Sequence, residues 1–122
     1  MRIVFMGSSG FACPSLERLL ACEACEVVGV VTQPDRPRGR HLEVAACPVK
    51  AYLGTRGIPV LTPVRVNAPE SLAALRQWRP DLMVVVAYGQ LLKPELLTLP
   101  WLGCVNVHGS LLPKYRGAAP VQ

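Results

Sequence analysis

Five short apolar segments recur along the chain, and each is bounded by glycine, proline or polar residues. They are residues 2–6, 27–32, 58–61, 81–87 and 104–108. Short runs rich in β-branched residues are typical of strands buried on both faces, as in a parallel sheet. Segment 81–87 is the most hydrophobic of the five, so we expect it at the centre of the sheet.

The stretches between these segments carry helix signals. Helices are expected at residues 14–22, from Pro48 to about Arg56 with Gly57 after it, from Pro69 to just before Pro80, and at residues 94–97. A proline stands at each of these four starts, which suits the first turn of a helix, and Gly57 suits a helix end. Asn67 precedes Glu70 by three residues, which resembles a capping box.

This alternation predicts an α/β fold, an open, mostly parallel, Rossmann-like sheet with helices on both faces. Right-handed crossovers favour the strand order 3-2-1-4-5. Ligands bind such sheets beyond the carboxyl ends of the strands, near the switch between the first and fourth strands. The Gly7 turn, the loop 88–92 and the segment 106–122 are all expected at that edge.

Two residues in the last segment have side chains suited to chemistry. Asn106 and His108 are two apart, so in a strand their side chains leave from the same face. An amide N–H can stabilise the negative charge that develops on a carbonyl oxygen in acyl transfer, and an imidazole can move a proton near neutral pH. In the alternative interpretation, Asn106 caps a loop and His108 is a buried histidine whose hydrogen bonds are made within the protein. The residues alone leave both interpretations open.

The residues that follow suggest a binding surface. Leucines beside Pro113 could wall a flat apolar ligand, and Lys114 and Arg116 could meet a carboxylate or phosphate. An ordinary surface loop is the alternative. The turn Gly7-Ser-Ser-Gly10 lacks the third glycine of a dinucleotide fingerprint, so tight packing of a helix on the sheet explains it sufficiently.

Residues 33–47 are expected to form a long, exposed, basic loop. The segment holds Arg36, Arg38 and Arg40 with two prolines and little apolar periodicity. Loops of this length are often functional, and three arginines could grip a phosphate backbone. A solvated loop without a partner is about equally compatible with the composition.

Composition narrows the class of protein. The 122 residues amount to one domain or part of one, and 51% hydrophobic with 17% charged residues argues against disorder. A net charge of +5 is compatible with an anionic partner without requiring one. The sequence shows no signal peptide and no apolar run of membrane-spanning length, so we expect a cytoplasmic protein without a membrane partner.

Five cysteines, an odd number, are scattered along the chain and are expected to be reduced thiols. Cys22 and Cys25 have CxxC spacing, but no second pair or histidine cluster completes a zinc site. They also lie at the end of a helix. Structural thiols are therefore favoured over metal or redox use, and no metal site is expected.

The run Asn106-Val-His-Gly-Ser-Leu-Leu-Pro-Lys-Tyr-Arg-Gly-Ala-Ala-Pro-Val-Gln122 resembles the signature of the folate-dependent formyltransferases. Supporting similarity lies in Arg2–Gly7, in Pro48-Val-Lys50 and in Val84-Val-Val-Ala-Tyr-Gly89. The loop 33–40 and the ending Gly-Ala-Ala-Pro-Val-Gln resemble the branch of the family that acts on tRNA.

This resemblance implies formyl transfer from 10-formyltetrahydrofolate, the co-substrate, to the α-amine of methionine on initiator tRNA, in translation initiation. By position, Asn106 would bind the formyl oxygen and His108 would act in proton transfer. The implied folate-binding residues are Tyr88, Gly89, Leu91, Leu92, Ser110, Leu111, Leu112 and Pro113. The implied tRNA contacts are Arg36, Arg38, Arg40, Lys114 and Arg116.

The resemblance covers residues 1–122 as the N-terminal part of the family's catalytic domain. The remainder of that domain, with a further catalytic aspartate, and a tRNA-binding β-barrel domain would follow in family members. The truncated chain is therefore expected to be inactive alone, and the full-length protein to be a monomer. Alternatives are formylation of an amino sugar or another amine, or a non-catalytic α/β module that binds folate or a nucleotide.

Overall fold

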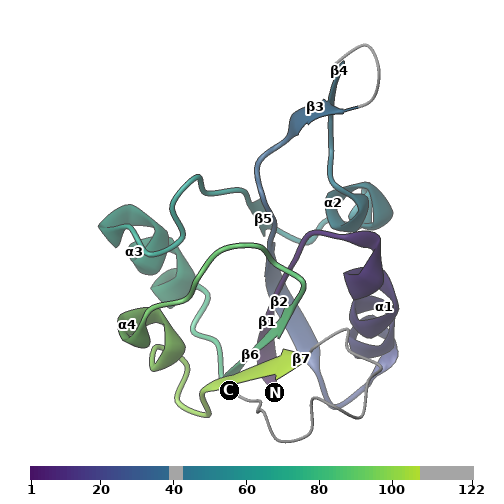
Figure 1. The fold of residues 1–122 in the computed structure, drawn as a ribbon. Coiled ribbons are helices and arrows are strands. Elements are labelled where there is room, and N and C mark those ends of the chain that lie inside the picture. The colour runs from purple at the N-terminus through teal and green to yellow at the C-terminus, as the bar shows by residue number, and fades with distance from the viewer. Residues whose placement is uncertain (39–42, 108–122) are drawn as a thin grey trace, which may run out of the picture.

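The structure, a computed structural model, describes residues 1–38 and 43–107. Its centre is a sheet of five parallel strands (Figure 1). The strands are β1 (Arg2–Gly7), β2 (Glu26–Val31), β5 (Val60–Leu61), β6 (Leu82–Val86) and β7 (Cys104–Val107). Their order across the sheet is β5-β2-β1-β6-β7. Counted within this sheet alone, that is the order 3-2-1-4-5, so the predicted topology is confirmed.

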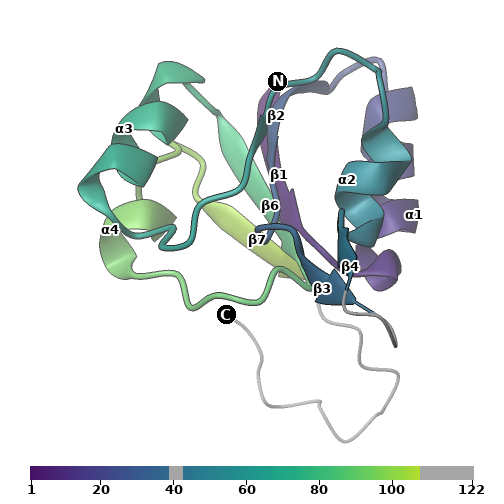
Figure 2. The same cartoon turned by 90° about the horizontal axis from the view of Figure 1, so that it is seen from above.

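Helices cover both faces of the sheet, as expected (Figure 2). The first face carries η1 (Gly10–Ala12), α1 (Cys13–Ala21) and α2 (Pro48–Leu53), and the other carries α3 (Pro69–Gln77) and α4 (Pro94–Leu97). Each of the four α-helices has a proline in its first turn, where the missing N–H costs no hydrogen bond. Among the described residues, no helix has the length and apolar character needed to cross a membrane.

The central strand is β1, not β6, so the prediction that segment 81–87 lies at the centre is wrong. Alternate residues of β1 enter different cores: Ile3 and Phe5 pack under α1 and α2, and Val4 and Met6 pack under α3 and α4. Strand β6 lies between β1 and β7. Hydrophobicity reports burial on both faces, which β1 and β6 share, and therefore does not distinguish the central strand from its neighbour.

The segment 33–47 is not simply a loop. It contains an antiparallel hairpin of β3 (Arg36–Arg38) and β4 (Glu43–Ala45), which extends away from the main sheet (Figure 1). Pairing the two stretches satisfies backbone groups that a loop would leave to water. Arginine and proline are poor strand signals, so the sequence pattern concealed this pairing.

Two helix-boundary predictions need correction. Helix α2 ends at Leu53 because Gly54, with φ +53°, takes the backbone out of the helix before Gly57 is reached. Helix α3 is preceded by Ala68 without a side-chain cap, so the capping box at Asn67 is absent. The Asn67 amide instead donates to Leu91 O at 2.8 Å and accepts from Lys93 N at 2.9 Å. The backbone after β6 offers both a donor and an acceptor, and the amide satisfies the two together.

Candidate functional site

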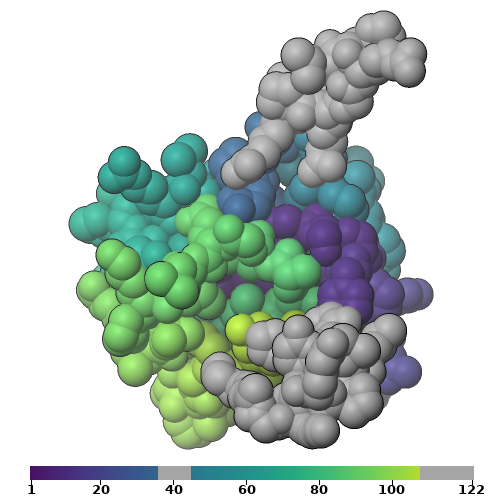
Figure 3. Space-filling view, in the orientation of Figure 1, coloured from purple at the N-terminus to yellow at the C-terminus, as the bar shows by residue number. Residues whose placement is uncertain are grey.

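A cavity of about 470 Å³ opens at the carboxyl ends of β6 and β7, the edge where a ligand site was predicted. In the space-filling view the loop after β6, in green, and β7, in yellow, border a hollow (Figure 3). Its lining residues come from β6, the loop after it, α4 and β7. They are Val85, Ala87, Tyr88, Gly89, Gln90, Leu91, Leu92, Leu97, Cys104, Asn106 and Val107.

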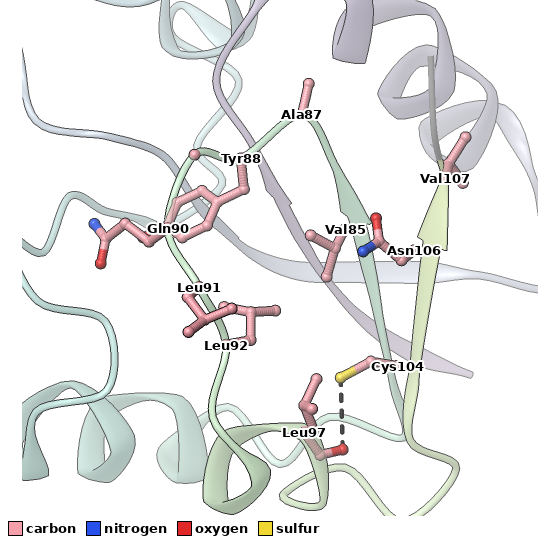
Figure 4. Close-up of a pocket in the computed structure, with 11 residues that line it drawn as sticks. Val85, Ala87, Tyr88, Gln90, Leu91, Leu92, Leu97, Cys104, Asn106 and Val107 are labelled. Carbon is pink, nitrogen blue, oxygen red and sulfur yellow. Dashed lines mark hydrogen bonds between the residues drawn. The ribbon is translucent and has the colours of Figure 1, made fainter. Parts of the chain in front are cut away.

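The side chain of Asn106 points from β7 into this cavity (Figure 4). Asn106 pairs in register with Val85 of β6, so it stands beside the last residues of a buried strand. Cys104 lines the same cavity because residues two apart in a strand share a face. The arrangement places an exposed amide beside largely apolar walls, where it can donate a hydrogen bond to a ligand carbonyl.

The loop after β6 has an unusual backbone that the rest of the fold holds in place. Ala87 has φ +51° and Gly89 has φ +106°, so the chain turns sharply over the cavity. Ser8, from the turn after β1, donates its N–H to Ala87 O at 3.1 Å and its hydroxyl to Tyr88 O at 3.1 Å. The same hydroxyl accepts from Gln33 N at 2.9 Å, which joins three loops at one buried oxygen.

The side chain of Gln90 also holds this loop in place through hydrogen bonds. Its Oε1 accepts from Val66 N at 2.9 Å, and its Nε2 donates to Gln33 Oε1 at 2.8 Å and to Pro63 O at 3.0 Å. All three partners are distant in sequence, so the amide connects the segment after β2 and the segment between β5 and α3 to the cavity wall. Sequence analysis gave Gln90 no role, because a glutamine in a loop carries no signal of such partners.

We expect Gln90→Ala to lower the free energy of unfolding by about 1–3 kcal/mol, since it leaves the Val66 N–H and the Gln33 carboxamide without their partner. The measurement is the urea midpoint of unfolding. Gln77→Ala is the matched control, because Gln77 is exposed at the end of α3 and should change stability by less than about 0.5 kcal/mol. Equal effects of the two substitutions would contradict the assigned role of Gln90.

Tyr88 is buried, with 3% of its surface exposed, and its hydroxyl has no hydrogen-bond partner among the described residues. Burial raises the pKa of this hydroxyl well above its usual value, because an ionised phenolate would lose its hydration inside the protein. The unfolded chain ionises near the ordinary pKa of about 10, so above that pH the folded protein binds more protons than the unfolded one. The contribution of the Tyr88 hydroxyl to the free energy of unfolding is therefore fully present below about pH 10 and falls as the pH rises further.

Replacing Tyr88 with phenylalanine is expected to flatten this alkaline loss of stability. At neutral pH the variant should be as stable as the parent, or more stable by about 1 kcal/mol, because an unpaired buried hydroxyl is removed. The check is urea unfolding of both proteins at neutral pH and above about pH 10. If both proteins lose stability equally on the alkaline side, ionisation of Tyr88 is not the cause.

Cys104 lines the cavity as a neutral thiol. Burial raises its pKa to about 11, and its Sγ donates to Leu97 O at 3.5 Å (Figure 4). A thiol is nucleophilic as the thiolate, so this environment argues against Cys104 as an attacking group. Within residues 1–38 and 43–107, no group of three or more His, Cys, Asp or Glu side chains could hold a metal ion.

The structure brings five of the predicted site residues to one cavity, namely Tyr88, Gly89, Leu91, Leu92 and Asn106. Leu91 is 81% exposed and lies at the rim. Arg36 and Arg38 lie on β3, in the hairpin that extends away from the main sheet. The other predicted residues lie outside the described part of the chain: Arg40, His108, Ser110, Leu111, Leu112, Pro113, Lys114 and Arg116. Sequence analysis missed Val85, Leu97 and Cys104 as lining residues, because apolar positions near a strand end look the same whether they face a core or a cavity.

A family model described as "Formyl transferase" matches residues 1–122. Among curated relatives, the chain is 54% identical over 121 residues to a protein of Geotalea daltonii and 57% identical over 124 residues to one of Microcystis aeruginosa. Both are named methionyl-tRNA formyltransferase. These alignments cover 99% and 100% of this chain but only 38% of each relative, so the chain spans well under half of their length.

Solved structures resemble the fold at lower identity. Phosphoribosylglycinamide formyltransferase from Bacillus halodurans superimposes with a TM-score of 0.68 at 22% identity, covering 94% of this chain and 59% of that one. Glycinamide ribonucleotide transformylase 1 from Geobacillus kaustophilus gives a TM-score of 0.62 at 24% identity, covering 96% of this chain and 62% of that one. At these identities the likeness concerns the arrangement of strands and helices.

Proposed function

The chain belongs to the formyl transferase family, and on that premise we propose that the full-length protein transfers a formyl group from 10-formyltetrahydrofolate to the α-amine of methionyl initiator tRNA. The names of relatives that share more than half of the aligned residues support this choice of acceptor. Residues 1–122 would form the N-terminal part of the catalytic domain, in a cytoplasmic, monomeric enzyme. The rest of that domain and a tRNA-binding domain would follow.

The observation that carries the proposal is the Asn106 carboxamide facing a largely apolar cavity at the carboxyl edge of the sheet. About 470 Å³ is within the usual range for a pocket that binds a small molecule. The flat ring system of the folate would lie between the loop of Tyr88–Leu92 and β7, and Ser110, Leu111, Leu112 and Pro113 would complete its walls.

In the proposed reaction, the lone pair of the amine attacks the formyl carbon, and negative charge gathers on the formyl oxygen. Asn106 donates its amide N–H to that oxygen and stabilises the tetrahedral intermediate. The bond from the formyl carbon to the folate nitrogen then breaks, the folate nitrogen gains a proton, and the amine loses one. His108, two residues after Asn106 in the sequence, is our candidate for moving that proton.

Recognition of the tRNA is proposed for the basic residues. Arg36 and Arg38 on the β3–β4 hairpin, together with Arg40, Lys114 and Arg116, would contact phosphates. The hairpin extends away from the sheet, so it is placed to reach a large substrate (Figure 1). Because phosphate contacts release counterions, charge-removing substitutions here should weaken tRNA binding and reduce its dependence on salt.

The test is formyl transfer by the full-length protein with two acceptors, methionyl initiator tRNA and an amino-sugar nucleotide. Product from the tRNA alone supports the proposal, and product from the sugar alone would favour an amino-sugar enzyme of the same family. Folate binding without transfer to either acceptor would indicate a binding module. Free methionine serves as the control for acceptor recognition, since it has the same amine without the tRNA.

A further inference from the structure

Two thiols meet at the edge of the sheet opposite the cavity. Helix α1 ends at Ala21 and β2 begins at Glu26, so the residues Cys22-Glu-Ala-Cys25 form the whole connection. The connection is a closed turn, in which Cys25 N donates to Cys22 O at 3.1 Å. Cys22 is exposed and Cys25 is half-buried, so the turn is open to small reagents.

The backbone of this turn is compatible with a disulfide between its two ends. A hydrogen bond from residue i+3 to residue i holds the two Cα atoms within about 7 Å, and disulfides join Cα atoms about 4.4–6.8 Å apart. The turn therefore brings the two Cα atoms into the range that a disulfide spans.

The surroundings make the two thiols unequal. The pKa of Cys22 is lowered chiefly by hydrogen bonding to the Cys25 side chain and next by hydrogen bonding to the backbone at Ala24. The pKa of Cys25 is raised chiefly by its interaction with the Cys22 side chain. The Met1 ammonium donates to Ala24 O at 2.9 Å and brings a positive charge beside the turn. An attacking thiolate and a neighbouring protonated thiol are the two parts of a dithiol that exchanges with disulfides.

We propose that Cys22 and Cys25 form a redox-active dithiol that a small-molecule disulfide converts to an intramolecular disulfide. The Cys22 thiolate attacks one sulfur of the small disulfide, and the first small thiolate leaves. Cys25 then loses its proton to solvent and attacks the Cys22 sulfur, which releases the second small thiolate. The protein loses two electrons and two protons, and the small disulfide is reduced to two thiols.

The other cysteines provide internal comparisons. Cys47 is buried, and burial raises the pKa of Cys13 and that of Cys104, the latter to about 11. Burial shields Cys47 from reagents, and the raised pKa values of Cys13 and Cys104 lower their thiolate fractions, so all three should exchange more slowly than Cys22.

The experiment equilibrates the reduced protein with mixtures of reduced and oxidised glutathione, followed by acid quenching, unfolding, alkylation and peptide mass spectrometry. We expect the peptide with Cys22 and Cys25 to lose both alkylation sites together, at a mixture where Cys13, Cys47 and Cys104 are modified at least about tenfold less. The variant C25S should trap a glutathione adduct on Cys22, because the second attack is removed.

Three results would overturn the proposal. One is accumulation of a glutathione adduct on Cys22 in the parent protein without ring closure. Another is oxidation of the pair no more readily in the folded protein than in the same chain in urea, since the turn would then contribute nothing. The third is faster adduct formation on Cys25 in C22S than on Cys22 in C25S, which would reverse the assigned order of attack.

Discussion

Asn106→Ala is expected to lower kcat for formyl transfer by about 10²–10³-fold, the range found when one donor to a developing oxyanion is removed. The amide points into the cavity from the face of β7 that Cys104 shares, so the loss is confined to a ligand contact (Figure 4). The bond to the formyl oxygen strengthens as charge develops there. The values of kcat and kcat/KM should therefore fall together, while KM for the folate changes little.

The assay uses the full-length protein, and Val105→Ala is the matched control. Val105 precedes Asn106 on β7, is 47% exposed and is not among the described residues that line the cavity. It should retain activity within about twofold. A rise in KM with kcat preserved would make Asn106 a folate-binding group with no special role in the transition state. Unchanged kinetics in Asn106→Ala would remove the catalytic assignment altogether.

Gly7→Ala is expected to lower the free energy of unfolding by about 3 kcal/mol, at the upper end of the usual cost of overpacking. Gly7 ends β1 and pairs with Val86 of β6. A Cβ at this position would lie 2.6 Å from Val86 O and 2.9 Å from both the Ala12 Cβ and the Phe5 ring. Val86 O belongs to the backbone of the neighbouring strand. The clash can therefore be removed only by shifting the sheet next to the hydrogen bonds that Ser8 makes to Ala87 O and Tyr88 O.

Urea unfolding measures this effect, with Gly10→Ala as a control from the same turn. Among the described residues, a Cβ on Gly10 would meet only the Pro48 Cβ, at 4.0 Å, which is an ordinary contact. The control should therefore stay within about 0.5 kcal/mol of the parent protein. Similar midpoints for Gly7→Ala and Gly10→Ala would show that the close contact at Gly7 relaxes without cost.

Local patterns were sufficient for much of the fold. Runs of β-branched residues marked the strands, prolines marked the helix starts, and the handedness of crossovers led to the observed strand order. The same reasoning located the loop of Tyr88–Leu92 and Asn106 at one edge. These features follow from short-range periodicity and backbone chirality, which each segment carries in its own sequence.

The exact bounds of elements depended on contacts outside each segment. The β3–β4 hairpin forms in a segment whose arginines and prolines gave no strand signal. Asn67 does not cap α3 as expected and instead makes hydrogen bonds to the loop after β6. The hairpin pairs two stretches of one segment, and Asn67 binds a loop more than twenty residues away; neither set of hydrogen bonds can be read from the local pattern of residue types.

By itself, the sequence determined the class of sheet, the order of its strands, the family resemblance and the position of Asn106 at a strand end. Only the tertiary structure decided that β1 is central, that Asn106 faces a cavity, and which side chains hold the cavity wall. The ties from Gln33 to Gln90 and from Ser8 to Tyr88 join residues 57 and 80 positions apart. Burial repeats with the period of a strand or helix and is legible locally, whereas a pairing over such distances exists only once the chain has folded.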